Sequence, residues 1–403
     1  MIELSHTIEK NKKISAIALL LSMVLLGVFP IDVLLPSVPS LSSHFNRSPA
    51  DIALSISLFA VGISISQLFI GPLSDKIGRK NLLLTGMAIS MLGALGCALV
   101  NEYSLFLLFR LIQALGCGCF VLSQALVQDL FEGKERDRLR ILIVTASGIF
   151  ISLSPLAGAS LQNRLDWPGS FYIFTIVAAV VFIKAYLLLE NPIPIVERAP
   201  HRSIFQSYRH ICTDIKFLGY WLIAALVFTC HFSFIVASPL IFMEHLQLSE
   251  YEFSLTLLFY GAAYVIGGAV AGLLSTKITA NTQITVGLCF IFCAGMMLFY
   301  LSHHFGLSTI TMLIPMIICT AGTTITRPAA TSKAMECFPD QAGASASAGN
   351  TLIFVCGGLI SALVNLSPVA LEATLALSFL LLSTTGLGLN TLIQRRNQRP
   401  VFE

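Results

Sequence analysis

Charged side chains are scarce in this chain of 403 residues, where Asp, Glu, Lys and Arg together account for 11%. Soluble globular proteins carry about 25% charged residues, which help to cover an apolar interior. Hydrophobic residues make up 56% of the chain, more than the polar remainder can shield from water. The composition therefore excludes soluble enzymes and nucleic-acid-binding proteins, and it indicates a protein whose solvent is lipid.

The motifs of several enzyme classes are also missing. The sequence contains no H-E-x-x-H, no G-x-S-x-G and no phosphate-binding G-x-x-x-x-G-K-[ST]. Its ten cysteines are scattered through apolar segments, where cysteine behaves as a small hydrophobe rather than as part of a metal site. We therefore expect no enzyme activity, no metal and no cofactor, so that energy for any work comes from a gradient or a partner.

What the chain does contain is a series of long apolar segments, each near the 20 residues that a helix needs to cross a bilayer. They predict an all-α integral membrane protein with twelve transmembrane helices. The first is too long for a cleavable signal peptide. The expected spans are 14–40, 52–73, 81–100, 104–129, 140–162, 169–189, 218–243, 253–275, 283–302, 308–332, 342–364 and 371–392.

The distribution of lysine and arginine predicts the orientation of these spans. With the N-terminus inside, 19 of the 24 lysines and arginines fall on one side of the membrane and only Arg47 and Arg164 on the other. Positive residues concentrate on the cytoplasmic side. We therefore expect an even number of spans and cytoplasmic N- and C-termini.

A polar stretch over residues 190–217 divides the spans into two sets of six, 1–189 and 218–403. A degenerate repeat agrees with this division: the segment Gly71–Ile77 closes the second span, and Gly272–Ile278, identical at five of seven positions, closes the eighth. Many secondary transporters show such repetition and bind substrate between the repeats. Chance similarity in a Gly-, Leu- and Ser-rich sequence is the alternative explanation.

Ionisable residues inside membrane spans are the first candidates for function. Asp32 follows the helix-disturbing Pro30 in the first span, and Arg110 lies about seven residues into the antiparallel fourth span, so both are expected at a similar depth. Burial disfavours an ionised carboxyl, whereas a nearby guanidinium favours it. Asp32 and Arg110 are therefore predicted to form a proton-exchanging site. A permanent ion pair that holds the two spans together is the alternative.

Other polar and aromatic residues within the spans are weaker candidates for contacts with a substrate. Each type of candidate has an alternative role. A histidine can be a packing residue, polar side chains can form hydrogen bonds between helices, and aromatic rings can face lipid. The candidates for the substrate cavity are Gln113, Gln124, His231, Arg327, Phe59 and Phe234.

Several motifs resemble those of a known transport family. The segment Gly71–Lys80 resembles the loop 2–3 signature of the major facilitator superfamily, and Asp32–Pro39 resembles the D-x-x-L-P-x-x-P stretch of its bicyclomycin/chloramphenicol-resistance (Bcr/CflA) group of drug:proton antiporters. Arg110–Gly116 in the fourth span and Ser154–Gly158 in the fifth also match. The likeness runs through the whole chain and implies the major facilitator fold of two six-helix halves.

The resemblance also implies a conformational gate on the cytoplasmic side. Asp75 would face the N-terminal end of the eleventh span, and Arg79 would pair with Asp129. A solvated loop that merely follows the charge rule is the alternative. The predicted gate residues are Gly71, Asp75, Gly78, Arg79 and Asp129.

In the fifth span, Gly148, Pro155 and Gly158 resemble a pattern usual in antiporters, although Ser154 stands where a glycine is common. Close helix packing is the alternative explanation for these small residues. Together, the resemblance implies a bacterial inner-membrane protein that exports a small amphiphilic compound, a drug or a metabolite, in exchange for protons. It would act as a monomer in the lipid bilayer, with no nucleic-acid partner. A dedicated exporter of an endogenous metabolite such as a siderophore is the alternative, and a non-transporting sensor a more remote one.

Overall fold

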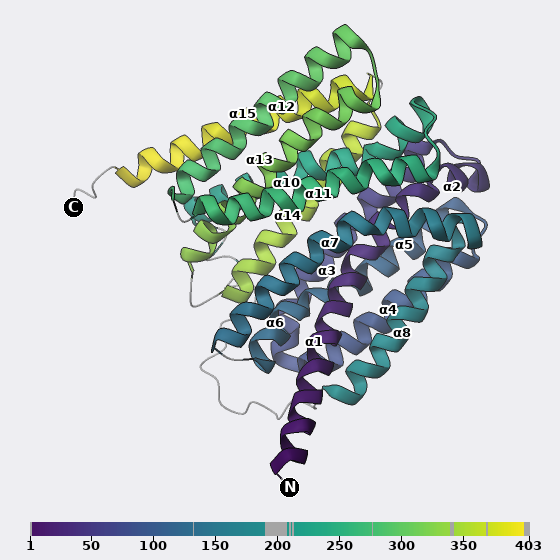
Figure 1. Cartoon of the computed structure of the whole chain (residues 1–403), viewed down its shortest axis with the longest axis vertical. Coiled ribbons are helices and arrows are strands. Elements are labelled where there is room, and N and C mark those ends of the chain that lie inside the picture. Colours follow the sequence, from purple (N-terminus) through teal and green to yellow (C-terminus); the bar gives the residue numbers. More distant parts are fainter. Residues whose placement is uncertain are drawn as a thin grey trace.

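The fold is taken from a computed structural model, which describes residues 2–131, 133–189, 208, 211, 213–275, 277–338, 342–367 and 370–398. Within these residues the protein is helical and has no β-strand. The helices run side by side in two bodies (Figure 1), the first purple to teal and the second green to yellow.

Within the described residues, the first body contains eight helices and two short 3-10 segments. They are α1 (Ile2–Asp32), η1 (Leu35–Ser37), α2 (Val38–Phe45), α3 (Pro49–Ile77), α4 (Arg79–Leu99), α5 (Tyr103–Cys117), η2 (Gly118–Val121), α6 (Leu122–Leu130), α7 (Gly133–Leu165) and α8 (Pro168–Leu188).

The second body consists of six long helices, the first of which continues into a π-helical turn. They are α10 (Ile215–Pro239) with η3 (Leu240–His245), α11 (Glu250–Ser275), α12 (Ala280–Phe305), α13 (Thr309–Glu336), α14 (Ala342–Asn365) and α15 (Leu371–Gln398).

The predicted spans match these helices closely. Among the described residues, eleven helical segments are long and apolar enough to cross a membrane. The remaining expected span, 140–162, lies inside the 33-residue helix α7. Short junctions separate two pairs of neighbouring spans: α4 ends at Leu99 before α5 begins at Tyr103, and α14 ends at Asn365 before α15 begins at Leu371.

Three of the predicted spans are not single helices. The first breaks after Asp32 and restarts as η1, where Pro36 lacks the N–H that a continuing helix would use. The fourth tightens into η2 at Gly118, between α5 and α6. The seventh becomes π-helical at Leu240, directly after Pro239. The break in the first span decides where Asp32 lies, at a helix end rather than within a helix.

Local chemistry explains the helix ends. Ser48 and Asp51 form a reciprocal capping box at the start of α3, with Asp51 N donating to Ser48 Oγ at 3.2 Å. Between α3 and α4 the chain turns on Gly78 with φ 89°, a conformation that favours glycine. Gly78 thus supplies the backbone freedom for the turn between these two helices.

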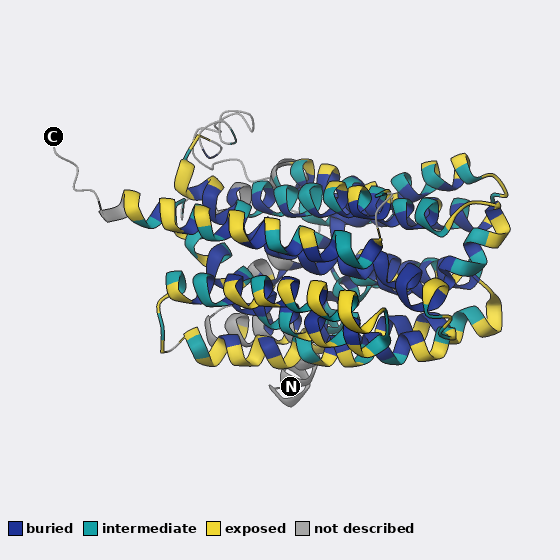
Figure 2. Cartoon of the chain, turned by 90° about the horizontal axis from the view of Figure 1, so that it is seen from above, coloured by how far each residue is buried: buried dark blue, intermediate teal, exposed yellow. Residues whose placement is uncertain are grey.

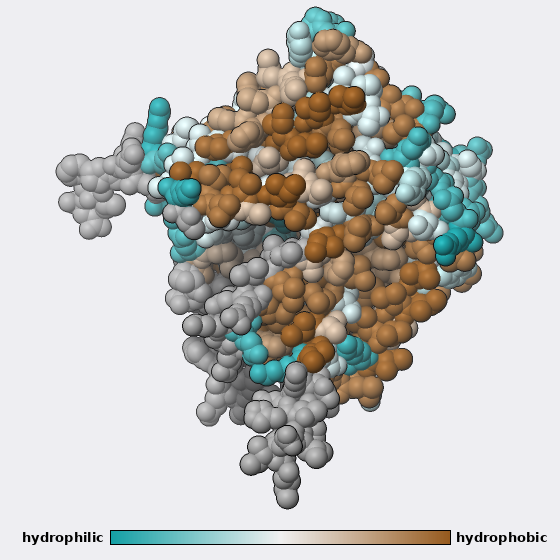
Figure 3. Space-filling view, in the orientation of Figure 1, coloured by the Kyte–Doolittle hydropathy of each residue, from teal (hydrophilic) through white to brown (hydrophobic). Residues whose placement is uncertain are grey.

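The surface shows where lipid would contact the protein. Buried residues lie mainly on the inner sides of the helices and exposed residues on their outer sides (Figure 2). Many exposed residues are large and apolar, and Leu187 is 76% exposed. On the face seen in Figure 3, apolar side chains cover the middle, while polar ones gather toward the end that carries α2. A soluble protein rarely exposes an apolar surface of this extent to water, whereas a lipid bilayer would cover it.

The two bodies meet along two pairs of helices, α3 with α14 and α7 with α11. Between α3 and α14, the hydroxyls of Ser57 and Ser361 lie 2.8 Å apart, and Thr351 Oγ1 donates to the Ser64 carbonyl at 3.2 Å. At the end of the protein that carries α2, which we call the α2 end, η1 also contacts α10 and α11. The break in the first span therefore lies against the opposite body.

Candidate functional site

Asp32 is the last residue of α1, at the break that faces the second body. It is 8% exposed. Its carboxyl has no hydrogen bond or ion pair to any residue within the described part of the chain. Tyr260 on α11 lies near enough for an ionised Asp32 to act on it electrostatically. Asp32 is thus a nearly buried acid without a fixed partner, situated where the two bodies meet.

Arg110 is fully buried on α5, but its guanidinium does not pair with Asp32. Its Nη1 donates to the Pro30 carbonyl at 3.2 Å and to Gln113 Oε1 at 2.9 Å. The Pro30 carbonyl is accessible because α1 ends two residues later, which removes its usual helical donor. The bond to Pro30, two residues before Asp32, agrees with the similar level expected for Asp32 and Arg110. The alternative of an ion pair between them is not seen among the described residues, and their role in proton coupling stays a prediction.

Aromatic rings surround the Arg110 guanidinium. Its central carbon lies 4.1 Å from the ring centre of Phe59 and 6.0 Å from that of Phe171. A cation over an aromatic face gains about 2 kcal/mol when it is desolvated. Phe59 packs against Arg110 inside the first body, and its predicted contact with a substrate stays a prediction.

His231 and Tyr260 form a hydrogen-bonded pair in the second body. His231 Nδ1 bonds to the Tyr260 hydroxyl, and the two rings stack with centres 5.4 Å apart. The ring centre of Phe234 lies 5.1 Å from that of Tyr260. A hydrogen-bonded packing histidine, the alternative considered for His231, agrees with these contacts, and its role toward a substrate stays a prediction.

Arg327 on α13 is partly exposed and lies over an aromatic cluster. Its guanidinium carbon is 5.0 Å from the ring centre of Phe228, which contacts Phe232 and Phe354 at 5.4 and 5.3 Å. No ion pair joins Arg327 to an acid among the residues that the structure describes. Its charge also acts on His231. Arg327 therefore presents a cation beside the aromatic cluster of Phe228, Phe232 and Phe354.

Only part of the predicted gate can be placed. Gly71 approaches the start of α14 so closely that a Cβ there would lie 2.5 Å from Ser347 Oγ. Arg79 opens α4 immediately after the Gly78 turn. The side chains of Asp75 and Asp129, and that of the cavity candidate Gln124, lie outside the described residues. The gate stays a prediction.

The three small residues of the fifth span all lie at close helix contacts. Gly148 faces Val265 on α11, the Pro155 carbonyl accepts a hydrogen bond from Ser254 Oγ at 3.0 Å, and Gly158 abuts the backbone of Val33. Close packing, the alternative considered for this motif, is what the structure shows. Whether the motif also marks an antiporter remains a prediction.

Asp166, which the sequence analysis did not single out, fastens the α2 end of the first body. It accepts hydrogen bonds from Ser40 Oγ, Gln162 Nε2 and the backbone N–H of Trp167 at 2.7–2.9 Å. Partial burial would raise the pKa of Asp166, but these hydrogen bonds outweigh it and hold the pKa below its usual value. An acidic residue directly before Trp167–Pro168, at a helix start, was the available signal.

Among the residues that the structure describes, no three His, Cys, Asp or Glu side chains gather as a metal site. The described cysteines are free.

Comparison with known proteins identifies the family. The model of the Major Facilitator Superfamily matches residues 17–362. The chain belongs to this superfamily. The members of the family that it resembles are transporters, so the prediction that this multi-pass membrane protein is not an enzyme is confirmed, as is the all-α major facilitator fold.

Relatives of this major facilitator chain carry names from drug resistance. It is 24% identical over 363 residues to a bicyclomycin resistance protein homolog of Haemophilus influenzae, covering 88% of this chain and 90% of the relative. It is 28% identical over 335 residues to multidrug resistance protein MdtL of Salmonella heidelberg, covering 82% and 83%. An uncharacterized transporter of the superfamily, YdgK of Bacillus subtilis, is 26% identical over 365 residues, covering 89% and 90%. The resemblance to the Bcr/CflA group is confirmed.

Proposed function

We propose that this transporter exports a small amphiphilic compound in exchange for protons. The observation that carries the proposal is Asp32, a nearly buried acid without a fixed partner at the junction of the two bodies. Such a carboxyl can bind a proton or stabilise a cationic group, and competition between the two would couple export to proton entry. The drug-resistance names of the relatives support an exported drug as substrate.

The remaining features of the proposal follow from the sequence. The charge asymmetry supports a bacterial inner-membrane protein with both termini in the cytoplasm. In that orientation the α2 end is external. Residues 1–189 and 218–403 act as two six-helix halves joined by the central loop 190–217. The transporter works as a monomer without a cofactor, and the proton gradient supplies its energy.

Arg327 favours a second candidate substrate class. A cation over an aromatic cluster, with no acidic partner in the described chain, suits a compound that bears both an acidic group and a ring. Siderophores and other acidic metabolites of the cell have this chemistry. An exporter dedicated to such a metabolite is therefore the alternative.

Accumulation assays test the proposed function. In bacterial cells depleted of other efflux pumps, expression of the chain should lower the accumulation of a fluorescent amphiphilic dye several-fold, and a protonophore should reverse the effect. Cells with an empty vector provide the baseline. Dye export that persists with the protonophore would contradict proton coupling, and secretion of a siderophore without any dye export would favour the alternative substrate.

The contact between Ser57 and Ser361 joins the two bodies on the side that is external in the proposed orientation. These hydroxyls lie 2.8 Å apart across the α3–α14 interface, near the α2 end. Export requires this end to open, so a bond across it should hold the transporter shut. We expect the double variant Ser57→Cys with Ser361→Cys to lose most transport after mild oxidation and to regain it with a reductant. Each single variant is the control, and unchanged transport by the cross-linked protein would show that the contact does not open.

A further inference from the structure

At the α2 end, two acidic residues from different bodies lie near each other. Glu250 is the first residue of α11 in the second body, and Asp166 lies in the turn between α7 and α8 of the first. An ionised Asp166 acts electrostatically on Glu250. One turn farther along α11, Ser254 Oγ donates to the Pro155 carbonyl of α7 at 3.0 Å. This bond holds the start of α11 against the first body.

The carboxyl of Glu250 has no partner that would stabilise its charge at this junction. Its Oε2 atom is buried and has no hydrogen bond within the described chain. The short segment η1, which also contacts α11, carries no charged residue. The charged or titratable side chains next to the junction in sequence, Arg164 before Asp166 and Glu244 and His245 before Glu250, are exposed to solvent. Asp166 is therefore the charge that Glu250 meets across the junction.

The charge of Asp166 is fixed in place. Its Oδ1 accepts hydrogen bonds from Ser40 Oγ, Gln162 Nε2 and the backbone N–H of Trp167. Partial burial disfavours its ionised form, but these bonds and the nearby His44 on α2 outweigh burial and keep the pKa of Asp166 below its usual value. Of the two acids, Asp166 is thus the one that stays ionised as the pH falls.

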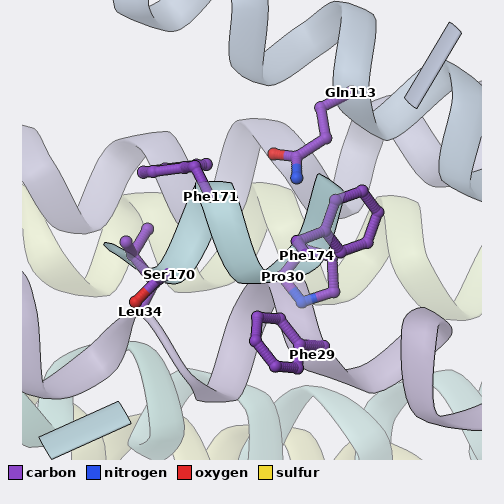
Figure 4. A pocket seen from close by; sticks show the side chains of 7 residues that line it. All are labelled: Phe29, Pro30, Leu34, Gln113, Ser170, Phe171 and Phe174. Carbon is purple, nitrogen blue, oxygen red and sulfur yellow. The ribbon is translucent and has the colours of Figure 1, made fainter. Parts of the chain in front are cut away.

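The segment that follows Asp166 is anchored inside the first body. Phe171 and Phe174, in the first two turns of α8, line a small and largely apolar cavity together with Phe29 and Leu34 of the first span (Figure 4). The cavity has a volume of only about 10 Å³, so little space remains between these side chains. The turn at Asp166 is therefore held by the first body, and its charge separates from Glu250 when the two bodies move apart.

Two carboxylates at such a junction repel each other when both are ionised. Burial and a nearby like charge both disfavour the ionised form of a carboxyl, so a proton binds more tightly when the α2 end is closed than when the two acids are apart. Because this linkage is reciprocal, a proton that prefers the closed arrangement also stabilises it. Acidic solution therefore favours closure of the α2 end, and neutral solution weakens it.

We propose that Asp166 and Glu250 form a pH sensor that favours closure of the α2 end when the external solution is acidic. Glu250 takes up the proton, while the hydrogen bonds of Asp166 keep that residue ionised. In the proposed orientation the α2 end is external, so the sensor responds to the side from which protons enter. Closure there keeps an exported compound from returning through the transporter.

The rate of disulfide formation between cysteines at positions 57 and 361 measures closure of the α2 end. In the purified protein with Ser57→Cys and Ser361→Cys, we expect Glu250→Gln to raise this rate several-fold at neutral pH, because it removes one of two repelling charges. At about pH 5, where Glu250 itself takes up a proton, the difference should largely disappear. Comparing the two proteins at the same pH cancels the pH dependence of the thiol chemistry.

Two further variants separate charge from packing. Asp166→Asn keeps the hydrogen-bond acceptor of the side chain and should also raise the rate at neutral pH. Once Asp166→Asn is present, adding Glu250→Gln should have little further effect, because the two charges act as a pair. Glu252→Gln is the matched control. Glu252 lies in the same turn of α11 but bonds to Ser249 of its own body, so the rate should not change.

Three results would overturn the proposal. They are equal rates for the parent and Glu250→Gln at neutral pH, a difference that persists unchanged at about pH 5, and an equal response of the Glu252→Gln control. If the cysteine variants do not fold, Tm of the protein without them provides a second measurement. Glu250→Gln should then raise Tm at neutral pH but not at about pH 5, and equal Tm shifts at both would contradict the sensor. Neither measurement involves transport, so the outcome is separate from that of the proposed efflux function.

Discussion

Asp32→Asn is expected to abolish export driven by a pH gradient while leaving the protein folded. Asparagine has nearly the same shape as aspartate but cannot exchange a proton at neutral pH. Asp32 has no hydrogen bond or ion pair to lose among the described residues, so the substitution should cost little stability. The measurement is substrate flux and proton flux in proteoliposomes across an imposed pH gradient. The expected loss of coupled flux is at least about 100-fold, which corresponds to about 2.7 kcal/mol.

Two controls make this result interpretable. Asp32→Glu keeps a carboxyl at the same position and should retain coupled transport. Glu336→Gln removes an exposed carboxylate that pairs with Lys333 at the end of α13, and it should transport normally. If Asp32→Asn transported with normal proton coupling, the proton site would lie elsewhere, and His231 with its partner Tyr260 would be tested next.

Gly158→Ala is expected to destabilise the first body strongly, although it adds only one methyl group. A Cβ at Gly158 would lie 2.2 Å from the carbonyl oxygen of Val33 and about 3 Å from its carbonyl carbon and Cα. These are backbone atoms, so the clash cannot be relieved by rotating a side chain. Instead, α7 must move away from Val33, which lies at the break in the first span. Such overpacking costs about 1–3 kcal/mol. Thermal unfolding in detergent should therefore show a clearly lower Tm and a lower yield of folded protein.

Gly268→Ala is the matched control for this prediction. A Cβ at Gly268, on α11, meets nothing within 4 Å. Alanine is preferred over glycine in helix interiors by about 1 kcal/mol. The control should therefore keep or slightly raise Tm. Equal effects of the two substitutions would show that the contact between Gly158 and Val33 does not limit stability.

The helices themselves could be predicted from the sequence because each one depends on composition over about 20 residues. The expected span 81–100 corresponds to α4 (Arg79–Leu99), and 283–302 lies within α12 (Ala280–Phe305). Breaks were harder to predict. The helix becomes 3-10 at Gly118 and π-helical directly after Pro239. The residues around both positions are apolar, so a hydropathy plot shows no interruption of the span there.

The partners of the candidate residues were harder still. Ser57 and Ser361 are separated by 304 positions and form a hydrogen bond. No local pattern marks either serine, since each is one small polar residue in an apolar helix. The contacts of Phe59 and Tyr260 were missed for the same reason. Aromatic rings are abundant in this chain, and only packing decides which of them meet a charge.

What the sequence by itself determined is the depth of each residue in the membrane. A helix rises 1.5 Å per residue, so counting from the span ends placed Asp32 and Arg110 at a similar level. The hydrogen bond from Arg110 to the Pro30 carbonyl agrees with that level. The tertiary structure decided the rotation of each helix about its axis and the break after Asp32. These depend on how side chains from distant segments fit together, and they direct Asp32 toward the second body while Arg110 remains inside the first.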